Sequence, residues 1–101
     1  MMEKIKGKTA DGFAFEIDNN VFHDYRFLRA LRQLQQDGDA FDSIGACFDL
    51  VTVLFNDRKK EEEFYAFLAK KGGGRATVEA VARATGEIMK ILQEKNKEVK
   101  N

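Results

Sequence analysis

The sequence predicts an α+β fold, mainly α, in which an N-terminal β-hairpin over residues 1–17 precedes a compact bundle of about four helices. Period-two alternation on both sides of Asp11-Gly12 indicates the hairpin, and apolar residues that recur at helical spacing indicate the helices. A chain of 101 residues, 44% of them hydrophobic, is long enough to build one core. We therefore expect a single domain over residues 1–101.

The predicted hairpin has one apolar face. Phe13, Phe15 and Ile17 alternate with Ala14 and Glu16, so the three larger apolar side chains point the same way. An isolated hairpin is only marginally stable in water, so we expect this face to pack on the helices.

The first two predicted helices cover residues 21–35 and 40–55. Cap and turn residues Asp18-Asn19-Asn20 precede the first, which is amphipathic, and Asp39 is the expected N-cap of the second. The second helix is apolar around most of its circumference. A helix of this kind is either buried on most sides or faces a partner.

Two further helices are predicted over residues 58–71 and 77–94. The first follows Asn56-Asp57 and ends at the run Gly72-Gly73-Gly74, and the second starts at Thr77 as N-cap. Gly86 falls on the polar side of the last helix, where it costs about 1 kcal/mol relative to Ala, and the sequence offers no packing reason for it. We expect residues 95–101 to form a frayed basic tail.

The sequence offers little catalytic chemistry, and we predict no enzyme, no metal and no cofactor. Cys47 is the only cysteine and falls on the apolar side of the second helix, where thiols behave as small hydrophobic groups. Asp42 and Asp49 share a polar strip, but no nucleophile, base and orienting group can be named together. A small enzyme or metal protein built on these three residues is the least favoured alternative.

The charge balance disfavours general nucleic-acid binding, because 17 basic residues face 17 acidic ones and phosphate binding needs a basic surplus. No apolar stretch is long enough to cross a membrane. The charges are unevenly spread, since residues 37–57 hold five acidic and no basic residues, whereas residues 58–101 hold eleven basic and seven acidic ones. A small helical regulatory or DNA-associated adaptor that uses Arg26, Arg29 and Arg32 remains an alternative function.

The acidic, apolar second helix is the predicted partner-binding region. Its candidate residues are Phe41, Phe48, Leu50, Val53, Leu54 and Phe55. The alternative that these side chains complete the core is equally open at this point. An exposed patch of this kind would also favour self-association into a homo-oligomer.

Several stretches combine into a layout that covers nearly the whole chain. They are the hairpin Gly7-Lys8-Thr9-Ala10-Asp11-Gly12-Phe13, the segment Asp24-Tyr25-Arg26-Phe27-Leu28-Arg29-Ala30-Leu31, an apolar central helix, Val78-Glu79-Ala80-Val81, Gly86-Glu87-Ile88-Met89 and a Lys-rich end. In this layout the chain resembles the small tail assembly chaperones of long, non-contractile-tailed bacteriophages (siphophage type).

The resemblance implies a function in viral tail assembly. Proteins of this family are not enzymes, act in the host bacterial cytoplasm and are absent from the mature virion. They bind and solubilise the long, helical tape measure protein and help to recruit subunits of the major tail (tube) protein. For this chain the resemblance therefore implies protein partners rather than nucleic acid or membrane.

Overall fold

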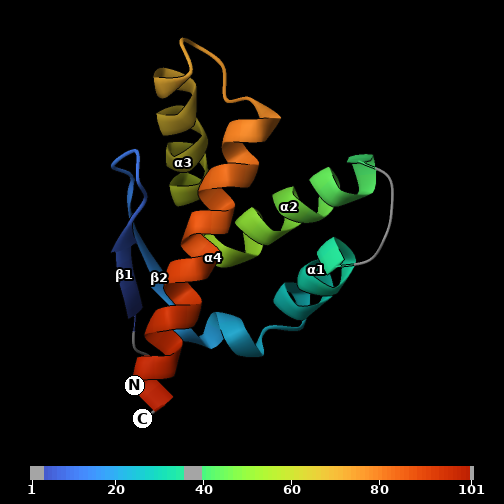
Figure 1. The fold of residues 1–101 in the computed structure, drawn as a ribbon, viewed down its shortest axis with the longest axis vertical. Coiled ribbons are helices and arrows are strands. Elements are labelled where there is room, and N and C mark those ends of the chain that lie inside the picture. The colour runs from blue at the N-terminus through green and yellow to red at the C-terminus, as the bar shows by residue number, and fades with distance from the viewer. Residues whose placement is uncertain (1–3, 36–39, 101) are drawn as a thin grey trace.

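The computed structural model describes residues 4–35 and 40–100, apart from the side chains of 40–43 and 97–100. It consists of strands β1 (Lys4–Lys8) and β2 (Ala14–Asp18), the 3₁₀ helix η1 (Asn19–His23), and helices α1 (Tyr25–Gln35), α2 (Ala40–Phe55), α3 (Arg58–Lys71) and α4 (Val78–Lys100) (Figure 1). The predicted architecture, a hairpin followed by a mainly helical globule, is confirmed. Within these described residues no helix has the length and apolar character needed to cross a membrane.

The hairpin pairs its strands antiparallel, with Ile5 opposite Ile17 and Gly7 opposite Phe15. Its turn contains Gly12 at a φ of 101°, a conformation that glycine adopts without steric cost. A Cβ on Gly7 would lie 2.6 Å from the Phe15 ring, so glycine lets that ring lie flat across the neighbouring strand. Phe15 and Ile17 are buried, which confirms the predicted apolar face.

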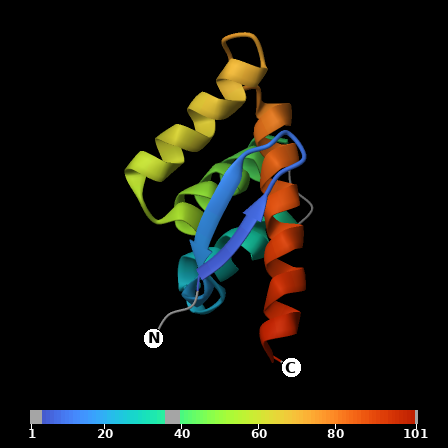
Figure 2. The ribbon, with the colours of Figure 1, turned by 90° about the vertical axis from the view of Figure 1, so that its left-hand side faces the viewer.

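Helix α2 is the centre of the fold. It contacts β2, α1, α3 and α4, and Figure 2 shows the hairpin lying over it with β1 beside α4. A hydrogen bond from the Ala10 backbone N–H to Glu87 Oε1, at 2.7 Å, also joins the hairpin turn to α4. The prediction that this helix is buried on most sides is confirmed.

The region between β2 and α1 differs from the prediction of one helix over residues 21–35. The Asp18 side chain accepts a hydrogen bond from Asn20 N and caps η1, which ends at His23. Asp24 Oδ1 then accepts from Arg26 N, so α1 begins only at Tyr25. Two successive aspartate caps thus divide the segment into a 3₁₀ helix and a shorter α-helix.

The other helix boundaries are set by local cap chemistry. Asp57 accepts from the backbone N–H groups of Lys59 and Lys60 and caps α3, while Gly73 and Gly74, both at positive φ, follow the end of that helix. Thr77 Oγ1 accepts from Ala80 N at the start of α4. Helix α3 has the predicted bounds 58–71 and α2 ends at Phe55 as predicted, while Asp39, the expected N-cap of α2, lies outside the described residues.

Helix α4 is longer than predicted. It continues to Lys100 instead of ending near Glu94, so the prediction of a frayed tail is wrong for residues 95–100, and residue 101 lies outside the described structure. Residues 95–100 contain neither glycine nor proline, and extending an existing helix costs far less than nucleating one.

Aromatic rings fill the space between the hairpin, the end of α2 and α3. Phe13 lies edge-on to Phe64, with ring centroids 5.3 Å apart, and Phe55 is at the same distance from Phe64. Phe64 is completely buried. This cluster joins the hairpin to the helices and leaves the opposite side of α2 to α1 and α4.

A candidate docking groove

The structure divides the predicted partner-binding residues into two groups. Four of them are buried in the core: Leu50, Val53, Leu54 and Phe55. The hairpin, α1, α3 and α4 cover these side chains, as in the alternative that they complete the core, and Leu50 also lines the groove described below. Phe48 is 37% exposed, and the side chain of Phe41 lies outside the described part of the chain.

Phe48 lies instead in an open apolar groove of about 340 Å³. The groove runs over α2, between α1 and α4, which lie apart in Figure 1. Its walls include Leu31 and Leu34 of α1, Cys47 and Phe48 of α2, and Val78 and Met89 of α4. The Phe48 ring is held by an edge-to-face contact with Tyr65 of α3, with centroids 6.5 Å apart.

Helical periodicity explains why α4 forms a wall of this groove. Val81 and Ile88 face the core, and the residues that directly follow them, Ala82 and Met89, lie about 100° further round the helix and face the groove. Leu31 follows Ala30 in the same way on α1. Both helices therefore carry an apolar stripe wider than their contact with α2 requires.

Gly86 is part of the α4 wall. A Cβ at this position would meet no atom within 4 Å, so the space beside the backbone is empty. The sequence showed a helix-weakening glycine on a polar side without a packing reason. Its position in the groove gives the reason, since any side chain there would narrow the groove.

Thr85 and Cys47 supply the buried polar atoms of the groove. Burial raises the pKa of the Cys47 thiol, and the nearby Thr85 hydroxyl opposes this rise only in part. A raised pKa leaves less thiolate at neutral pH, so Cys47 is a weak nucleophile. Thr85 is 3% exposed, and its Oγ1 has no partner at hydrogen-bonding distance and angle.

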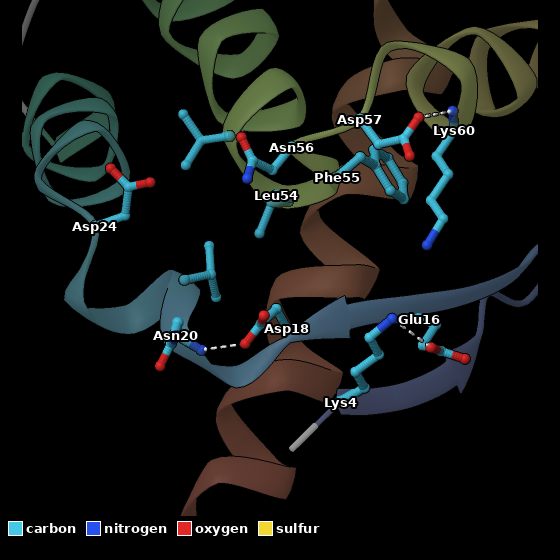
Figure 3. A pocket seen from close by; sticks show the side chains of 12 residues that line it. Lys4, Glu16, Asp18, Asn20, Asp24, Leu54, Phe55, Asn56, Asp57 and Lys60 are labelled. Carbon is cyan, nitrogen blue, oxygen red and sulfur yellow. Dashed lines mark hydrogen bonds and ion pairs between the residues drawn. The ribbon is translucent and has the colours of Figure 1, made fainter. Parts of the chain in front are cut away.

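A second, polar hollow of about 370 Å³ lies where the hairpin, η1 and the α2–α3 link meet (Figure 3). Its carboxylates already have structural roles: Asp18 and Asp57 cap helices, and Glu16 pairs with Lys4 at 3.2 Å. The Lys4 ammonium lowers the pKa of Glu16. This hollow is therefore a junction of caps and ion pairs, and no set of three potential metal ligands occurs among the described residues.

The residues behind the alternative functions are not brought together. Arg26 forms an ion pair with Asp24 at 2.7 Å and donates to Asn56 Oδ1, and Arg29 lies over the Tyr25 ring at 5.2 Å. These contacts occupy two of the three arginines of the predicted DNA-associated surface. The side chain of Asp42 lies outside the described structure, so its pairing with Asp49 stays a prediction.

The groove over α2 is thus the feature of the described residues whose shape and lining are suited to binding. Comparison with protein-family models, with curated proteins and with solved structures finds no match to this chain. The function is therefore inferred from the chemistry of the groove and from the resemblance in sequence layout.

Proposed function

We propose that this protein is a tail assembly chaperone of a long, non-contractile-tailed bacteriophage. It binds and solubilises the tape measure protein in the host bacterial cytoplasm, helps to recruit tail tube subunits, and does not remain in the mature virion. It acts by binding alone, without a catalytic step or a cofactor.

The observation that carries this proposal is the open apolar groove between α1 and α4. Amphipathic helices commonly bind by laying their apolar face into such a groove. A tape measure protein is long and helical, so it presents this kind of face repeatedly. Met89 and Phe48 suit the task because flexible and aromatic side chains adapt to different apolar partners.

Exposed apolar residues lie in the groove wall and beside it. Leu28 is 54% exposed and Val78 is 43% exposed, both on the helices that form the walls. Apolar patches of this kind on a free protein indicate a partner surface or self-association. In the proposed function the tape measure protein covers the surface, and a second copy of the chain competes for it.

Co-expression with the tape measure protein of the same genome tests the proposal. We expect the tape measure protein to become soluble and to elute with this chain on gel filtration. Phe48→Glu places a charge in the groove and should abolish the complex. Tyr25→Glu makes the same change at an exposed aromatic residue outside the groove and should leave the complex intact.

Two results would contradict the proposal. The first is an unchanged solubility of the tape measure protein with no complex on the column. The second is a complex that forms equally well with Phe48→Glu and with Tyr25→Glu, because binding would then occur elsewhere on the surface.

A further inference from the structure

We draw no further inference here: the strongest candidate, the open apolar groove over α2 between α1 and α4, belongs to the site already described, and nothing in the described part of the chain shows what covers it.

Discussion

Replacing Gly86 by alanine should make the protein more stable. A glycine within a helix costs about 0.8–1.0 kcal/mol relative to alanine, because it loses more backbone freedom on folding. The added Cβ would meet no atom within 4 Å, so no steric cost reduces the gain and no new packing adds to it. We therefore expect a gain of about 1 kcal/mol, or roughly 4–8 °C in Tm for a domain of this size.

Gly45 provides a matched control in α2. A Cβ there would also meet nothing within 4 Å, and the residue is exposed and does not line the groove. Gly45→Ala should therefore give a similar gain. Urea unfolding followed by far-UV circular dichroism measures the free energy of unfolding of both variants.

Substituting leucine at the same two positions extends the comparison from stability to binding. Leucine is nearly as good a helix former as alanine, so the larger side chain can be tested without weakening the helix. Gly86→Leu should fill the groove and weaken the complex with the tape measure protein, whereas Gly45→Leu should leave the complex intact. The reasoning is refuted if Gly86→Ala gains no stability while Gly45→Ala does, because the space beside Gly86 would then be filled. It is also refuted if Gly86→Leu binds as tightly as the unmodified chain.

Three further predictions concern the core, the cap of α1 and the thiol. Phe64→Ala should lower the free energy of unfolding, measured in urea, by about 3–5 kcal/mol, because the ring is completely buried against Phe13 and its neighbours. A decrease below about 1 kcal/mol would contradict that packing. Arg26 holds the pKa of the Asp24 carboxyl below its usual 3.8, so this pair stabilises the fold above that pH and its contribution is lost as the pH falls further. Asp24→Asn keeps the cap and removes the charge, so unfolding measured along a pH series should depend less on pH in the acid range, and an unchanged slope would argue against the pair. Cys47 should react with iodoacetamide more slowly in the folded chain than in the urea-unfolded chain, and more slowly still when the groove is occupied. Equal reaction rates in all three states would contradict the burial of this thiol.

The sequence predicted the elements whose ends depend on local chemistry. Asp57 and the glycines after Lys71 fix both ends of α3 through contacts within a few residues, so the pattern was sufficient there. It missed the cap at Asp24, because an aspartate four residues into an amphipathic pattern looks like a surface residue until its bond to Arg26 N is seen. It also ended α4 too early, since a polar segment without helix breakers gives no signal of where a helix stops.

The candidate site depends on tertiary packing and was only partly predictable. The apolar circumference of α2 correctly indicated a central helix, but periodicity does not say which neighbour covers which side. Leu50 and Val53, for which the sequence left both a partner surface and the core open, are buried, whereas Phe48 on the same helix is exposed. The sequence did contain one signal of the groove, the glycine at position 86 without a packing reason. Its meaning becomes clear only when α4 is seen to lie beside α1 and α2.

The groove is assembled from segments that are far apart along the chain, and this determines when it exists. Its lining begins at Leu31 and is complete only at Gln93. A nascent chain therefore carries the floor of the groove on α2 well before α4 has emerged to form the second wall. The hairpin turn is likewise tied to Glu87 only at this late stage. A partner thus meets the assembled surface only on a chain that has been synthesised through α4 and folded, so incomplete chains do not compete for it.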